Sequence, residues 1–91
     1  MQEEYKKERK FIHKSLAGVI KKLREEKSKS ISTISNEFNI SKTIWADAER
    51  GETDIQLTSL WRISEALDMS LSELISLLEK ELPENWSFTE K

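Results

Sequence analysis

The chain has 91 residues, of which 36% are apolar and 35% charged, with a net charge of −2. This length predicts one small domain rather than two, and the absence of cysteine excludes disulfides and thiolate metal sites. No apolar run approaches the roughly 20 residues that a membrane-spanning helix needs, and no signal-peptide core is found. We therefore expect a cytoplasmic protein.

The charges are divided unevenly along the chain. Residues 1–30 contain ten basic and five acidic side chains, a net charge of +5, so the remaining residues carry −7. A basic N-terminal half suits a polyanionic partner, with the acidic half facing away from it. The charge pattern alone, however, favours ordinary solvated helix surfaces.

A first helix is predicted between Phe11 and Lys27, because apolar residues recur there at helical spacing. This apolar stripe consists of Phe11, Ile12, Leu16, Val19, Ile20 and Leu23. Residues 1–10 are highly charged, and we interpret them as an N-terminal extension of the same helix.

The stretch from Ser30 to Gly51 predicts two short helices joined by a tight turn. Ser30 and Ser41 are each placed to cap a helix, because a serine hydroxyl can accept from the open N–H groups of a first turn. Asn39 tolerates the left-handed conformation of a tight turn, and Gly51 suits a left-handed C-cap. This is the layout of a helix-turn-helix, whose second helix typically enters the DNA major groove.

Two further helices are expected after this motif. The motif itself should bury Ile34, Phe38, Ile40, Trp45 and Ala48. A fourth helix is predicted from the apolar positions Ile55, Leu57, Leu60, Ile63, Ala66 and Leu67. Ser70 and Glu73 form a capping box that opens a fifth helix, and Pro83 limits it. With no alternating pattern typical of strands, the sequence predicts an all-α domain over residues 11–82, followed by a tail at 83–91.

Five helices with the motif in second and third place resemble the lambda-repressor-like, XRE/Cro-type DNA-binding domains over roughly residues 16–78. The residues that carry the resemblance are Ile20-Lys21-Lys22-Leu23-Arg24, Ile34, Ile40-Ser41, Glu49-Arg50-Gly51, Leu57/Leu60/Ile63/Ala66/Leu67 and the SLSEL segment at 70–74. The loop from Glu52 to Leu57 is similar to that of restriction–modification controller proteins. The resemblance implies a five-helix DNA-binding domain.

The resemblance also implies roles for individual residues. Arg24 and Glu49 match a structural salt bridge between the first helix and the end of the third. The base-facing positions of the recognition helix are Lys42, Thr43 and Asp47. The positions expected near DNA phosphates are Ser30, Ser41, Arg50 and Thr53, to which we add the neighbouring Lys29. Among the residues that depart from the family pattern, Ile31 offers only apolar contact where glutamine is common, and Asp47 adds a negative charge to the reading face.

Apolar side chains in the C-terminal half exceed what one small core needs. The candidates for a dimer interface are Trp61, Ile75, Leu82, Trp86 and Phe88. A twofold dimer is the commonest oligomer, and it would place two recognition helices about 34 Å apart. We therefore predict a homodimeric, sequence-specific regulator of transcription, in the first instance a repressor, that reads an inverted repeat in double-stranded DNA without a cofactor.

An alternative function remains open, and an enzyme is disfavoured. The alternative is a protein-interaction module of the same fold, such as an antitoxin or adaptor whose aromatic tail binds a partner; Ile31 and Asp47 favour it. His13 is the one histidine, and a catalytic base needs an oriented partner. The two glycines, Gly18 and Gly51, do not make a glycine-rich phosphate-binding loop. No cluster of histidine and acidic residues has metal-ligand spacing.

Overall fold

The computed structural model describes residues 5–89, so the first four residues of the charged extension and the last two of the tail lie outside it. The element order is α1 (Lys6–Glu26), α2 (Ile31–Glu37), α3 (Lys42–Arg50), α4 (Leu57–Ala66) and α5 (Leu71–Lys80). Over this range there is no strand, and no helix is long and apolar enough to cross a membrane. The predicted all-α, five-helix fold is confirmed.

Short-range signals set the starts of α2, α3 and α5 and the end of α3. Ser30, Ser41 and Ser70 each accept a hydrogen bond from a backbone N–H three residues later, and Ser70 belongs to a complete capping box. Gly51 ends α3 with a φ of 67°, and Asn39 turns the chain between α2 and α3 with a φ of 55°. The sequence predicted each of these, because caps and left-handed turns depend on the residue and its nearest neighbours.

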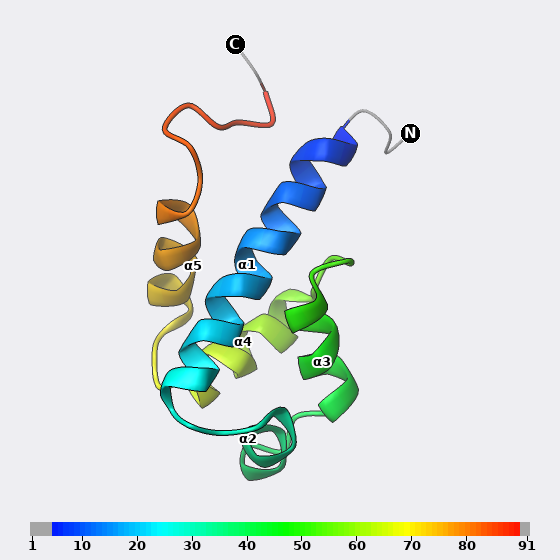
Figure 1. The fold of residues 1–91 in the computed structure, drawn as a ribbon, viewed down its shortest axis with the longest axis vertical. Helices are drawn as coiled ribbons and strands as arrows, with labels where there is room; N and C mark the ends of the chain where they lie inside the picture. Colours follow the sequence, from blue (N-terminus) through cyan, green and yellow to red (C-terminus); the bar gives the residue numbers. More distant parts are fainter. Residues whose placement is uncertain (1–4, 90–91) are drawn as a thin grey trace.

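The long helix α1 lies at the centre of the fold, between α3 on one side and α5 on the other (Figure 1). The short helix α2 lies beyond the C-terminal end of α1. Helix α4 passes behind α1 in this view. All five helices contribute to one core, which consists of Leu16, Val19, Ile20, Ile34, Ile40, Trp45, Ala48, Leu60, Ile63, Ala66, Leu67, Leu74 and Leu78. Trp45 is fully buried, as predicted.

Not every apolar residue of the predicted helices lies in this core. Phe38 is 43% exposed, and Leu57 is 62% exposed. The prediction that Phe38 is buried is wrong because Phe38 is the C-cap of α2, where the chain leaves the helical path that would carry the side chain inward. The fourth helix begins at Leu57 rather than Ile55, which lies in the preceding loop and packs against the core.

The tail returns to the start of α1 (Figure 1). Trp86 lies 6.3 Å from Phe11 and Phe88 lies 5.6 Å from Tyr5, measured between ring centroids, and the two tail rings are 5.0 Å apart. We call these four residues the aromatic clasp. Aromatic pairs at such distances contribute about 0.5–1.5 kcal/mol each beyond their buried area, so the clasp stabilises the first turns of α1.

Candidate nucleic-acid interface

Helix α3 buries one face and leaves the other in solvent. Trp45 and Ala48 point into the core. The opposite face carries the residues predicted to read bases together with one predicted to contact phosphate: Lys42, Thr43, Asp47 and Arg50. Lys42 and Thr43 are exposed, and Asp47 is partly exposed. A helix with a polar outer face and an anchored inner face has the arrangement needed to enter a major groove.

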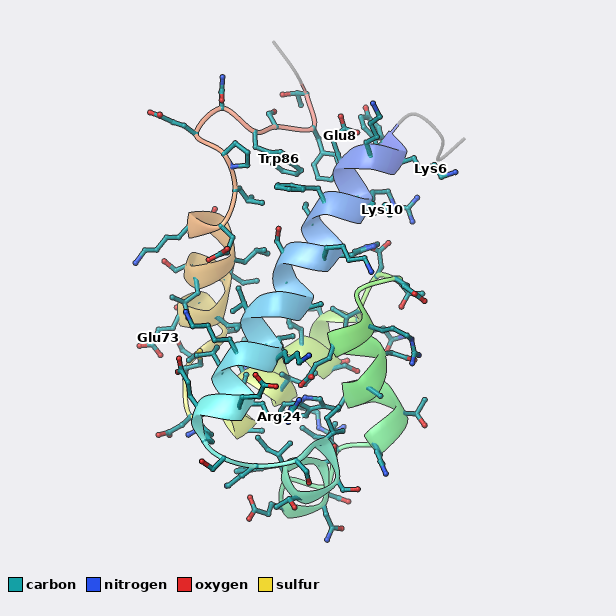
Figure 2. The ribbon with its side chains drawn as sticks, viewed as in Figure 1. Lys6, Glu8, Lys10, Arg24, Glu73 and Trp86 are labelled. Carbon is teal, nitrogen blue, oxygen red and sulfur yellow. The ribbon has the colours of Figure 1, made fainter. Side chains whose placement is uncertain are left out.

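The anchor at the end of α3 is an ion pair between Arg24 and Glu49. Arg24 donates from Nε to Oε2 at 2.6 Å and from Nη2 to Oε1 at 2.9 Å, and both side chains are largely buried. Trp45 Nε1 donates to the same carboxylate at 2.8 Å. The hydrogen bond to Glu49 raises the pKa of Arg24, against the opposing effect of burial. Arg24 also donates to the backbone oxygen of Lys29 at 2.8 Å, so one guanidinium joins α1, α3 and the start of α2 (Figure 2).

The structure brings Asp47 and Arg50 into contact. Arg50 Nη2 meets Asp47 Oδ1, and Arg50 Nε lies 3.8 Å from Glu52 Oε1. The negative charge that Asp47 adds to the reading face is therefore partly neutralised by its neighbour. Exposed pairs of this kind contribute only about 0–1 kcal/mol, so Arg50 can exchange its partner for a phosphate at little cost.

The other predicted phosphate contacts lie near the starts of α2 and α3. Besides capping α2, the exposed Ser30 hydroxyl donates to Thr33 Oγ1 at 3.0 Å. Lys29 Nζ is paired with Glu37 Oε1 at 2.6 Å. Ser41 is exposed at the start of α3. Ile31 is half-buried and packs against the core, so its side chain contributes to the fold.

The loop after α3 is tied to α1 by contacts that the sequence analysis missed. His13 Nε2 donates to Asp54 Oδ1 at 2.5 Å, and Arg9 Nη2 lies 3.5 Å from Asp54 Oδ2. The hydrogen bond from His13 lowers the pKa of Asp54, and the charge of Arg9 acts in the same direction while burial opposes it. Thr53 is exposed in this loop. No local pattern reveals the contact, because His13 and Asp54 are 41 positions apart.

Arg62 is a second residue that the sequence analysis missed. Its Nη2 donates to the backbone oxygen of Asn39 at 2.5 Å, which joins α4 to the turn of the helix-turn-helix. The turn is thereby held by a side chain from outside the motif. An exposed arginine on a predicted helix gives no sign of this role.

The five candidate dimer residues fall into separate groups. Trp61 is 50% exposed on α4, one turn after the exposed Leu57. Ile75 and Leu82 are half-buried, on α5 and just after it. The remaining two, Trp86 and Phe88, are in the aromatic clasp and contact α1 of their own chain. Trp86 and Phe88 therefore already have packing partners within their own chain.

Comparison with known proteins decides the family. The helix-turn-helix family model matches residues 20–74, which include the motif and the helices around it. The chain belongs to the lambda-repressor-like helix-turn-helix family. This is a family of regulatory DNA-binding proteins rather than enzymes.

A relative of this chain is Control protein C.MunI from Mycoplasma sp. The two are 36% identical over 63 residues, which cover 68% of this chain and 85% of the relative. No solved structure matches the chain significantly. The predicted resemblance to the lambda-repressor-like family and to controller proteins is confirmed.

Proposed function

We propose that the protein is a sequence-specific regulator of transcription that binds double-stranded DNA through α3. The observation that carries this proposal is the exposed outer face of α3 on a helix fixed from behind by the Arg24–Glu49 pair. A rigidly held helix can present its side chains to base edges in one defined register. The name of the relative, a control protein, agrees with a regulatory role.

Base reading is assigned to Lys42, Thr43 and Asp47. The Lys42 ammonium can donate to guanine O6 and N7, and the Asp47 carboxylate can accept from a cytosine amino group. Thr43 can offer either its hydroxyl or its methyl group. Because Lys42 and Thr43 belong to the first turn of α3, they suit the deepest part of the groove, where recognition helices place their N-terminal residues.

Phosphate binding is assigned to residues around this face: Lys29, Ser30, Ser41, Arg50 and Thr53. Backbone contacts position a protein on the duplex, and neutralised phosphates supply most of the salt-dependent affinity. Two of these residues, Lys29 and Arg50, have carboxylate partners in the free protein. We therefore expect modest affinity for one copy, which a second copy would increase.

We further propose that two copies bind an inverted repeat, with residues 11–82 as the DNA-binding unit and 83–91 as a tail. Trp61 is the most exposed of the dimer candidates, so we place it at the centre of the interface. The half-buried Ile75 and Leu82 would add to the contact. Aromatic side chains are enriched in the cores of such interfaces. Trp86 and Phe88 would contribute from the outer surface of the aromatic clasp. In this form the protein would act in the cytoplasm as a repressor or autoregulator.

Selection from a random pool of duplex DNA at near-physiological salt, followed by sequencing, tests this function. We expect an enriched inverted repeat whose half-site centres are about one helical turn apart. The matched variant Lys42→Ala/Asp47→Ala should fail to enrich the same sequence. If the wild-type chain enriches no sequence and also binds no duplex at low salt, the proposed function is wrong.

That last outcome would favour a protein-interaction module such as an antitoxin or adaptor. The pairing of Lys29 with Glu37 and of Arg50 with Asp47 supports this alternative, because both cations are already satisfied without DNA. Retention of binding at low salt separates the two functions, since phosphate contacts strengthen as salt falls.

A further inference from the structure

A groove of about 480 Å³ lies between the N-terminal half of α1 and the loop that follows α3. We call it the basic groove, and its charged lining consists of Lys6, Arg9, Lys10, His13, Lys14 and Glu52. None of these residues belongs to the proposed α3 interface. We propose that the basic groove binds the phosphate backbone of duplex DNA that flanks the sequence read by α3, an inference that rests on the proposed function.

Three lysines form one row along this groove. Lys6, Lys10 and Lys14 are four residues apart, so they share one face of α1 and span about 12 Å. Lys6 and Lys10 extend to the side of α1 away from Trp86, the side on which the loop after α3 lies (Figure 2). Lys14 Nζ donates to the backbone oxygen of Arg50 at 3.2 Å. The row therefore begins at the free end of α1 and ends against the last residue of α3.

The charge of the groove is positive after its internal pairs are counted. Asp54 is engaged by His13 and Arg9, and Glu52 lies within reach of Arg50. Neither Lys6 nor Lys10 has a salt-bridge partner among residues 5–89. Four cations of the groove, Lys6, Arg9, Lys10 and Lys14, face only the two carboxylates of Glu52 and Asp54 in the described part of the chain, which leaves a local excess of positive charge for a polyanion.

The first turn of α1 carries two lysines. Lys6 and Lys7 open the helix, and Glu8 is the one acidic residue of its first turn. Positive charge at a helix N-terminus is unfavourable because the helix dipole is positive there. The aromatic clasp holds this end of the helix through Tyr5 and Phe11 and so offsets the unfavourable charges.

The spacing of DNA phosphates fits the row. Each strand of a duplex carries one phosphate per about 3.4 Å of helix axis. If Arg50 and Thr53 contact one stretch of backbone, further phosphates of that stretch come within the span from Lys14 to Lys6. The basic groove would then lengthen the footprint on the duplex without reading its sequence.

The test compares Lys6→Gln/Lys10→Gln with the control Lys22→Gln/Lys80→Gln, which removes the same charge from the surface between α1 and α5. Binding is measured against salt concentration for two duplexes, one trimmed to the sequence selected by the wild type and one extended by about 10 base pairs, one helical turn, on each side. Where selection gives no sequence, random duplexes of the same two lengths are used. Circular dichroism confirms that both variants fold.

We expect the wild type and the control to bind the extended duplex more tightly than the trimmed one. The Lys6→Gln/Lys10→Gln variant should lose that gain, by about tenfold at low salt, and its slope of log affinity against log salt should fall by about 1–2. If the two variants show the same gain in affinity for the extended duplex and the same salt slope, the basic groove does not bind DNA, and the proposal for the α3 interface is unaffected. Absence of wild-type binding to either duplex would overturn the proposed function together with this inference.

Discussion

Arg24 and Glu49 join the first and third helices through two hydrogen bonds of 2.6 and 2.9 Å, although 25 positions separate them in the chain. The carboxylate also accepts from Trp45 Nε1, so the largest core side chain is oriented by the same group. A pair of this kind contributes less to stability than its geometry suggests, because burial removes water from both charges. Its main effect is to fix the orientation of α3 relative to α1.

Removing one member of this pair should destabilise the fold strongly. Arg24→Met leaves the Glu49 carboxylate buried without its cation, and such losses cost about 3–5 kcal/mol. The measurement is the free energy of unfolding from urea titration. As a control, Lys29→Gln breaks the exposed pair with Glu37 and should cost less than about 1 kcal/mol. Similar losses of unfolding free energy for both variants would show that the buried Arg24–Glu49 pair stabilises the fold no more than an exposed ion pair does.

The two glycines should respond in opposite directions to alanine. At Gly51, a Cβ would lie 2.9 Å from both Ala17 Cβ and the His13 backbone oxygen, and the φ of 67° is unfavourable for alanine. We expect Gly51→Ala to cost at least about 2 kcal/mol. At Gly18, inside α1, nothing lies within 4 Å, so Gly18→Ala should stabilise by about 0.5–1 kcal/mol. Thermal unfolding of both variants checks the contrast; a neutral Gly51→Ala would contradict the close contact.

The contact between His13 and Asp54 predicts a dependence of stability on pH. Because the folded-state pKa of Asp54 is lowered, the unfolded chain binds this proton more readily, and stability rises with pH across the interval between the two pKa values. The contribution is complete above the unfolded pKa of about 3.9 and is lost as the pH falls through the lower folded value.

Asp54→Asn should therefore flatten the pH dependence of the free energy of unfolding below about pH 4. Urea titrations from neutral to strongly acidic pH give the measurement. Glu65→Gln, on the exposed surface of α4, serves as the control and should leave the curve of the wild type unchanged. An Asp54→Asn curve parallel to that of the wild type would mean that the loop is not held by this carboxylate.

Substitution of Lys42 and of Arg50 by alanine should weaken DNA binding in different ways. Lys42→Ala should weaken binding to the selected sequence by about 1–3 kcal/mol and relax the preference at one base pair. Arg50→Ala should weaken binding to every sequence alike and lower the salt slope by about 1. Fluorescence anisotropy with matched and mismatched duplexes separates the two effects. Unchanged preference in Lys42→Ala would remove that residue from base reading.

Trp61 and Trp86 distinguish the two possible sites of dimer contact. Trp61→Ala should weaken a dimer by about 2 kcal/mol or more if Trp61 is at the centre of the interface. Trp86→Ala should mainly loosen the aromatic clasp, because Trp86 already lies against Phe11. Sedimentation equilibrium over a range of protein concentrations measures both. A larger loss of self-association in Trp86→Ala would instead assign the interface to the clasp.

Local features of the fold could be predicted closely. The caps at Ser30, Ser41 and Ser70 and the left-handed Gly51 follow from a residue and its nearest neighbours, and each is found where it was expected. Phe38 was misplaced for a related reason, since periodicity indicates a face of a helix but not the point at which the chain leaves it. The start of α4 at Leu57 lies two positions after the predicted start at Ile55 for the same cause.

Apart from the Arg24–Glu49 pair, which the family resemblance implied, the contacts between distant polar residues could not be predicted in this way. The sequence by itself determined five helices, the serine caps of three of them, most of the buried positions and membership of the helix-turn-helix family. Only the tertiary structure decided that Asp54 meets His13, that Arg62 reaches the turn at Asn39, and that the tail lies against α1. These contacts depend on how the helices cross, and the crossing is set by the packing of the whole core rather than by any short stretch of chain.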